Sequence, residues 1–318
     1  MNILFVTATR IGDVVLTTGV LDWLAKRHPA ARFTIACGRP AAPLLEAFPQ
    51  LERLIIIDKK PLSAHWIGLW ARCMTQAWSL VVDLRSSGLS WFLLASRRVV
   101  RRRRDNTRHG VLELADLFAV ERPPAPRLWT KREHESRAEA LLSGSPVLGI
   151  GPTANWRGKE WPADRFAALV ERLTGADGPL PGARVAVFGA LAERVAAEPV
   201  LASVPASRRI DLVGTIDLPT VAACLRRCAL YVGNDSGLMH MAAAVGTSTL
   251  GLFGPGNETR YGPWGDHTAV VRTPLPPEQL MGAGFDHRTT GTLMESLTVS
   301  AVEAAARQLL QRMREHAA

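Results

Sequence analysis

Short, mainly apolar runs recur along the chain and alternate with longer segments of helical periodicity. They lie at residues 2–7, 32–37, 54–58, 80–84, 147–150, 183–188, 210–213, 229–232 and 249–253. Strands that are apolar on both faces are buried on both sides, and helices between them let neighbouring strands run parallel. The sequence therefore predicts an α/β fold in which helices cover both faces of parallel sheets.

A break in this alternation divides the chain. Residues 143–146, Ser-Gly-Ser-Pro, interrupt the pattern, which then restarts. A length of 318 residues suits two domains of about 150 residues each. We expect domains at 1–145 and 146–318, with ligands bound beyond the carboxyl ends of the strands. Residues 255–291 are rich in Gly and Pro and predict loops, and residues 299–316 predict an amphipathic helix.

The stretch Gly233–Ala244, GNDSGLMHMAAA, joins an apolar run to an alanine-rich helical segment. Asp235 or Ser236 can cap this helix, and Gly237 has no Cβ to keep a ligand from the free amides of the first turn. Such a helix start suits an anion, above all a phosphate. His240 lies four residues after Ser236 and shares its helix face. An ordinary capped helix with a core histidine fits the same spacing, so the residues alone leave both interpretations open.

Positive charge is unevenly placed. The formal net charge is +9, and residues 1–145 contain 22 Lys and Arg against 13 Asp and Glu, whereas residues 146–318 contain 16 of each kind. Six arginines lie in the run Arg97–Arg104, so much of the excess is one local patch. The run fits a mobile surface loop, a surface for anionic lipid or an acidic lipid-linked acceptor, or a nucleic-acid site. No aromatic interleaving or helix-turn-helix pattern supports nucleic acid, and we expect none as a partner.

The four cysteines lie in separate apolar segments. Cys224 and Cys228 are four residues apart on an expected helix, but no second Cys or His pair stands near them in sequence. Together with Cys37 and Cys73 they predict buried free thiols and no zinc site. The amino terminus has a strand pattern without a charged leader, and no apolar run approaches ~18 residues, so we expect a cytoplasmic protein.

Three segments resemble glycosyltransferase family 9, the heptosyltransferases of lipopolysaccharide synthesis. They are Ile3–Thr18 with its Gly-Asp turn, Gly151–Pro162 with its Lys-x-Trp-Pro sequence, and Asp235–Ala243. The segments occur in the family's order and span most of the chain. The resemblance implies a GT-B architecture, in which two Rossmann-like α/β/α domains face a central cleft. It also implies inverting, metal-independent transfer of a heptose from an ADP-sugar to a hydroxyl of a lipopolysaccharide core acceptor, without a cofactor.

The same resemblance assigns the central roles. Glycosyl transfer needs a base for the acceptor hydroxyl and positive charge for the departing diphosphate. Asp13 corresponds to the family's base, although its position also fits the N-cap of a helix over 14–27. Lys159 is the candidate diphosphate clamp, with a solvated loop lysine as the alternative.

Further residues follow from the resemblance. Glu193 matches an acid that binds the ribose hydroxyls in the family, and a plain exposed glutamate is the alternative. Arg10 and Gly12 are expected to face the anionic acceptor, and an ordinary salt bridge is the alternative for Arg10. The expected donor-binding residues are Thr153, Lys159, Glu193, Asp235, Ser236, Gly237, Leu238 and His240. The helix at 299–316 is expected to pack across the domain junction.

The expected partners are an ADP-sugar and an anionic, lipid-linked saccharide. Peripheral contact with the inner face of an anionic membrane is expected through Arg97–Arg104. Two other functions stay open: an inactive nucleotide-sugar-binding protein that serves as an interaction protein, and a two-domain nucleotide-sugar epimerase. Intact Asp13 and Lys159 argue against the first, and the second needs further acid-base groups that the sequence does not reveal.

Overall fold

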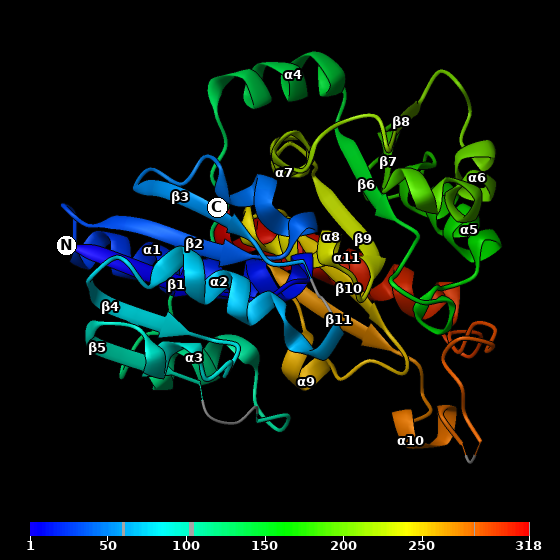
Figure 1. The fold of residues 1–318 in the computed structure, drawn as a ribbon. Coiled ribbons are helices and arrows are strands. Elements are labelled where there is room, and N and C mark those ends of the chain that lie inside the picture. Colours follow the sequence, from blue (N-terminus) through cyan, green and yellow to red (C-terminus); the bar gives the residue numbers. More distant parts are fainter. Residues whose placement is uncertain (59–60, 102–104, 283, 318) are drawn as a thin grey trace. The chain divides into compact units, whose positions relative to one another are not determined.

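The computed structural model describes all residues of the chain except 59–60, 102–104, 283 and 318. The chain divides into two compact units, Met1–Trp129 and Thr130–Ala318. This division falls earlier than the expected boundary near residue 145, because helix α4 (Arg132–Leu142) packs against α7 (Leu218–Arg226) of the second unit. Each unit contains a parallel sheet with helices beside it (Figure 1).

The described part of the first unit forms a five-stranded sheet in the order β3-β2-β1-β4-β5, with every neighbouring pair parallel. Its strands and α-helices are β1 (Asn2–Val6), α1 (Ile11–Arg27), β2 (Arg32–Cys37), β3 (Leu51–Ile56), α2 (His65–Cys73), β4 (Trp78–Asp83), β5 (Ala95–Val100) and α3 (Gly110–Leu117). Successive side chains of a strand point to opposite faces. Ile3 and Phe5 join the core on the side of α1, and Leu4 and Val6 join the core on the side of α2.

The described part of the second unit forms a six-stranded parallel sheet in the order β11-β10-β9-β6-β7-β8. This is the strand order of the Rossmann dinucleotide-binding fold. Besides α4 and α7, its strands and α-helices are β6 (Val147–Gly151), α5 (Ala163–Thr174), β7 (Arg184–Gly189), α6 (Arg194–Ser203), β8 (Arg209–Val213), β9 (Leu230–Asn234), α8 (Gly237–Ala244), β10 (Thr249–Phe253), α9 (Glu258–Tyr261), β11 (Thr268–Arg272), α10 (Pro277–Leu280) and α11 (Val299–Ala317).

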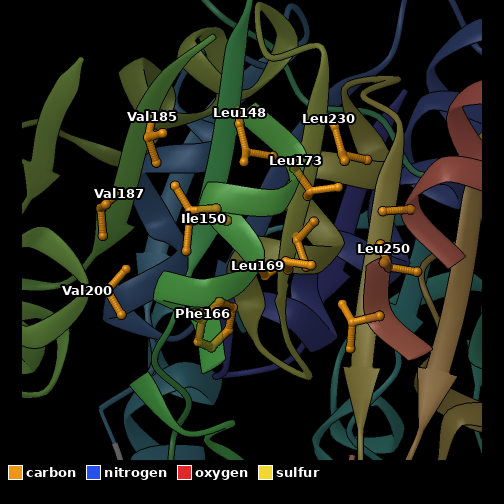
Figure 2. Close-up of a cluster of buried hydrophobic side chains, with 14 of the residues drawn as sticks. Leu148, Ile150, Phe166, Leu169, Leu173, Val185, Val187, Val200, Leu230 and Leu250 are labelled. Carbon is orange, nitrogen blue, oxygen red and sulfur yellow. The ribbon is translucent and has the colours of Figure 1, made fainter. Parts of the chain in front are cut away.

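A large apolar core supports this second sheet (Figure 2). Leu148 and Ile150 of β6 pack with Phe166 and Leu169 of α5, and all four are fully buried. Burying a side chain of this size stabilises the fold by roughly 1.5–3 kcal/mol. Helix α11 contributes Leu309 to the same core and contacts α5, β10 and β11 of its own unit. Packing of this helix across the domain junction stays a prediction.

Two strands form where the sequence pattern did not indicate them. β5 occupies the first part of the arginine run, and β11 lies within residues 255–291, so the expectation of loops throughout that segment is wrong. Both are edge strands, and most of their residues are partly or fully exposed. An edge strand is covered less than an inner strand, so it does not need the continuous apolar run by which the inner strands are recognised.

The cysteines are as expected. All four are buried and outside disulfides, and burial raises the pKa of the Cys37 thiol to about 12. Among the helices that the structure describes, none is long and apolar enough to cross a membrane.

Candidate active site

The second sheet reverses its strand order between β6 and β9, and loops that diverge at such a switch point leave room for a ligand. The structure brings the two expected phosphate-binding segments together there. Lys159, in the 3₁₀ helix η4 (Arg157–Lys159) after β6, donates from Nζ to Asp235 Oδ2 at 2.5 Å, across 76 positions of sequence. The Lys159 side chain is 20% exposed and that of Asp235 is 8% exposed. The lysine is therefore held in place at the switch point and is not a fully solvated loop residue.

Helix α8 starts beside this ion pair. Ser236 occupies its N-cap position in an extended conformation, but its side chain makes no capping hydrogen bond to the described residues. Asp235 directs its carboxylate to Lys159, so the prediction that one of these two side chains caps α8 is not fulfilled. Gly237 and Leu238 form the first turn, whose amide groups and dipole favour an anion. His240 is buried one turn further along the helix.

Thr153 and Glu193 meet at the neighbouring strand ends. Thr153 Oγ1 donates to Glu193 Oε2 at 2.9 Å, and the amide of Ala190 donates to the same oxygen at 2.8 Å. Glu193 ends the 3₁₀ helix η5 (Leu191–Glu193) that follows β7, and it is half-buried. The alternative of a plain exposed glutamate is therefore wrong.

Asn234 is a supporting residue that no sequence motif indicated. Its side chain is fully buried, donates from Nδ2 to the Pro152 carbonyl at 2.8 Å, and accepts from the Trp161 amide at 3.1 Å. These bonds tie both ends of the loop that carries Lys159 to β9. A polar residue that closes an otherwise apolar buried strand is a signal that could have identified it.

Gly256 and Glu160 were also missed. A Cβ on Gly256 would lie 2.5 Å from Asp235 Oδ2, so a larger residue at this position would push against the ion pair. Glu160 is half-buried and accepts from the Ala154 amide at 3.2 Å. Burial raises the pKa of its carboxyl above the ordinary value, and the Ala154 amide opposes that shift.

In the first unit, Arg10, Gly12 and Asp13 lie at the start of α1, directly after β1. The helix begins at Ile11 with Arg10 as its N-cap, so the alternative that Asp13 is the N-cap is wrong. Asp13 is the third residue of the helix and is half-buried, and a carboxylate in a first turn interacts favourably with the helix dipole. Arg10 is exposed.

A second aspartate stands at the switch point of the first sheet. Asp83 ends β4 and pairs in register with Val6 of β1. It is fully buried and accepts from the Arg85 amide at 2.9 Å, the Ser87 amide at 3.0 Å and Ser87 Oγ at 2.7 Å. These bonds hold the turn after β4, so Asp83 has a structural task.

The arginine run is not one uniform surface. Arg98 donates to the carbonyls of Ser90 and Leu93 at 2.8 and 2.6 Å, and Arg101 forms a bidentate pair with Glu113. Arg97 is exposed. The alternative of a mobile surface loop is therefore wrong for the residues of β5. The remaining members of the run, 102–104, lie outside the described residues. Nor does the described part of the chain contain any group of three His, Cys, Asp or Glu side chains arranged to hold a metal ion.

Two Rossmann-like units, with a cation and a helix start at the switch point of the second, are typical of GT-B-type glycosyltransferases. The sequence profile of glycosyltransferase family 9 (heptosyltransferase) matches residues 79–283. The chain therefore belongs to glycosyltransferase family 9.

Individual relatives agree with this assignment. The lipooligosaccharide heptosyltransferase 2 of Haemophilus influenzae is 25% identical over 315 residues, which cover 86% of this chain and 88% of that protein. A family 9 glycosyltransferase from Veillonella parvula superposes with a TM-score of 0.78 at 23% identity, covering 98% of this chain and 97% of that one. The Escherichia coli ADP-heptose lipopolysaccharide heptosyltransferase II gives a TM-score of 0.74 at 20% identity, covering 99% and 100%. The predicted α/β class with two Rossmann-like units is confirmed, and neither the interaction protein nor the epimerase is favoured.

Proposed function

We propose that this protein transfers a heptose from ADP-heptose to a hydroxyl group of a lipopolysaccharide core acceptor, with inversion at the anomeric carbon. The observation that carries the proposal is the Lys159–Asp235 pair beside the uncapped start of α8, at the switch point of the second sheet. The names of the relatives supply the sugar, the nucleotide and the acceptor.

The reaction requires one bond to form and one to break. The acceptor oxygen attacks the anomeric carbon, and the bond from that carbon to the diphosphate oxygen breaks, so that ADP leaves with the bonding electrons. Asp13 takes the proton of the acceptor hydroxyl as general base. Lys159 and the first-turn amides of Gly237 and Leu238 stabilise the charge on the departing diphosphate, in place of a metal ion.

The remaining residues position the two substrates. Thr153 and His240 border the diphosphate site, and Glu193 accepts the ribose hydroxyls while Thr153 and Ala190 hold its carboxylate. Arg10 and Gly12 contact the anionic acceptor. The protein works at the cytoplasmic face of the membrane that carries this lipid-linked acceptor, and exposed basic residues such as Arg97 attract it there.

Thermal unfolding with different nucleotides tests the donor assignment. A ligand that binds only the folded protein raises its unfolding temperature. ADP and ADP-heptose are expected to give larger shifts than UDP, GDP and their sugars at equal concentration. Equal shifts with all three nucleotides would remove the support for ADP. If the protein does not transfer heptose from ADP-heptose to a lipid A–core acceptor, the proposed activity itself is overturned.

A further inference from the structure

The turn before β5 presents three large apolar side chains to solvent. It contains the 3₁₀ helix η3 (Leu89–Phe92), and Trp91, Phe92 and Leu94 are 63%, 77% and 72% exposed. We call these three residues the apolar tip. Scattered exposed apolar residues are ordinary, whereas a contiguous group marks an interaction surface.

The tip stands on a rigid base. Leu89 and Leu93, which alternate with the exposed residues, are buried in the core that α2 covers. Trp70 of α2 donates from Nε1 to the Phe92 carbonyl at 3.0 Å, which fixes α2 against the turn. Ile67 lies three residues before Trp70 on the same helix and is 68% exposed.

Several backbone carbonyl groups of the turn are satisfied within the protein. Arg98 donates to the carbonyls of Ser90, Leu93 and Ala95, and the Trp78 amide donates to that of Leu94 at 2.9 Å. A carbonyl that loses its water without gaining a partner costs several kcal/mol in an apolar environment. Because these partners are internal, the tip can leave water at little cost to its backbone.

The segment that contains the tip is basic in sequence. Residues 61–104 contain eight arginines and a single acidic residue, Asp83, which is fully buried. Arg72 and Arg97 are exposed. A second copy of the same surface would bring like charges together, whereas a bilayer of anionic lipid complements them.

We propose that the apolar tip inserts into the interfacial layer of an anionic phospholipid bilayer, with Arg97 at the level of the lipid phosphates. Trp is enriched at this layer, and amphipathic surfaces with basic flanks bind there through buried apolar area plus charge attraction. The inference rests on the proposed function, since it explains how the enzyme reaches a lipid-linked acceptor. It adds a specific insertion surface to the general attraction of basic residues.

Sedimentation with vesicles tests the proposal. The full-length protein and a Trp91→Ser/Phe92→Ser/Leu94→Ser variant are mixed with vesicles of phosphatidylglycerol and phosphatidylethanolamine, and with phosphatidylcholine vesicles. The triple variant should bind the anionic vesicles at least about tenfold more weakly, because it withdraws three large side chains from the apolar layer. Arg97→Ser should weaken binding about fivefold at low salt and have little effect at 0.5 M salt, where exposed charges are screened.

A matched control removes exposed apolar residues elsewhere. Leu191 and Val195 of the second unit are 71% and 87% exposed, and Leu191→Ser/Val195→Ser should leave vesicle binding unchanged. Trp91→Phe keeps an aromatic tip, so it should bind within about twofold of the wild type. When the vesicles contain lipids with brominated acyl chains, which quench tryptophan fluorescence on contact, the Trp91→Phe variant should lose the part of the quenching that comes from Trp91.

Each of the following results supports or overturns the insertion of the tip. Wild-type protein that ignores anionic vesicles, or a triple variant that binds them as well as the wild type, would overturn the insertion. So would self-association in the absence of lipid that the triple variant abolishes without any change in vesicle binding. The triple variant should keep ADP affinity and transfer to a deacylated acceptor. If vesicle binding depends on the tip but neither the wild type nor any variant transfers heptose, the proposed function is refuted and the insertion surface is supported.

Discussion

The two sheets each place an aspartate at the switch point, and the two carboxylates meet different partners. Asp83 in the first unit is fully buried and bonded to Arg85 and Ser87 of its own turn. Asp235 in the second unit is 8% exposed and faces Lys159, which comes from a different loop.

The difference shows what a switch point can be used for. Local donors next to Asp83 close the turn, so its carboxylate has no further task. The Lys159 cation comes from another loop and remains partly exposed, so it can interact with an incoming phosphate while Asp235 holds it in position. In the first unit the half-buried carboxylate beside the switch point is Asp13, on the helix after β1. Four sets of substitutions test this division between structural and functional residues.

The largest effect is expected at Asp13. Asp13→Asn keeps the size of the side chain and removes its ability to accept a proton. If Asp13 is the base, turnover should fall by about 100-fold or more with donor affinity nearly unchanged, because a positioned base contributes 10²–10⁴ in rate. Steady-state kinetics and calorimetry with ADP measure the two quantities.

The control lies on the same helix. Asp22 pairs with Lys26 at 2.7 Å on α1, and Asp22→Asn should leave turnover unaltered. Near-normal turnover of Asp13→Asn would mean that the base is another group.

Lys159 should give the next effect. Lys159→Ala is expected to weaken ADP binding by about 1–3 kcal/mol, the range for a charge-assisted hydrogen bond. It also leaves Asp235 without its cation, which lowers the stability of the fold. Adding Asp235→Asn should restore stability and leave ADP affinity low, as calorimetry and thermal unfolding can show.

This pair of variants separates the clamp from a purely structural ion pair. An unchanged ADP affinity in Lys159→Ala would assign the lysine to structure alone. Lys26→Ala, which removes the exposed lysine of the pair with Asp22 on α1, should change neither quantity appreciably.

Asp83 should show the opposite pattern. Asp83→Asn replaces one carboxylate oxygen by an amide donor that faces the donors of its own turn, so the unfolding free energy should fall by about 1–3 kcal/mol. ADP affinity should not change. Urea unfolding measures the loss, with the exposed Asp116→Asn, which only disrupts a surface pair with Arg108, as the control. A large loss of ADP affinity in a folded Asp83→Asn protein would contradict the structural role.

The sequence was sufficient for the parts of the fold that depend on burial from both sides. The inner strands are mainly apolar runs, and their positions agree with the structure. The edge strands β3 and β8 kept enough apolar residues to be recognised in the same way. β5 and β11 were not predicted, because an edge strand is only partly covered by the rest of the protein and tolerates arginine and threonine. The start of α1 was misplaced by three residues because Arg10, not a usual capping residue, precedes the helix.

The candidate site was only partly predictable for a different reason. Lys159 and Asp235 could each be named from their motifs, but their pairing depends on the strand order, which places the loops after β6 and β9 side by side. Asn234 and Gly256 support the site through bonds and close approach between segments far apart in sequence. No local pattern specifies such contacts.

The smallest effect is expected at Glu160, and it is a change with pH. Burial raises the pKa of this carboxyl in the folded protein, so the folded state disfavours its charged form. Below the ordinary glutamate pKa the carboxyl is neutral in both the folded and the unfolded state, so its burial does not reduce stability. Stability is lost as pH rises through the pKa of the carboxyl in the folded protein. Glu160→Gln should therefore match the wild type near pH 4 and become slightly more stable than it by pH 7. Urea unfolding across this range measures the difference, with the exposed Glu171→Gln as control. A variant less stable than the wild type at pH 7 would mean that the bond from the Ala154 amide outweighs the cost of burying the charge.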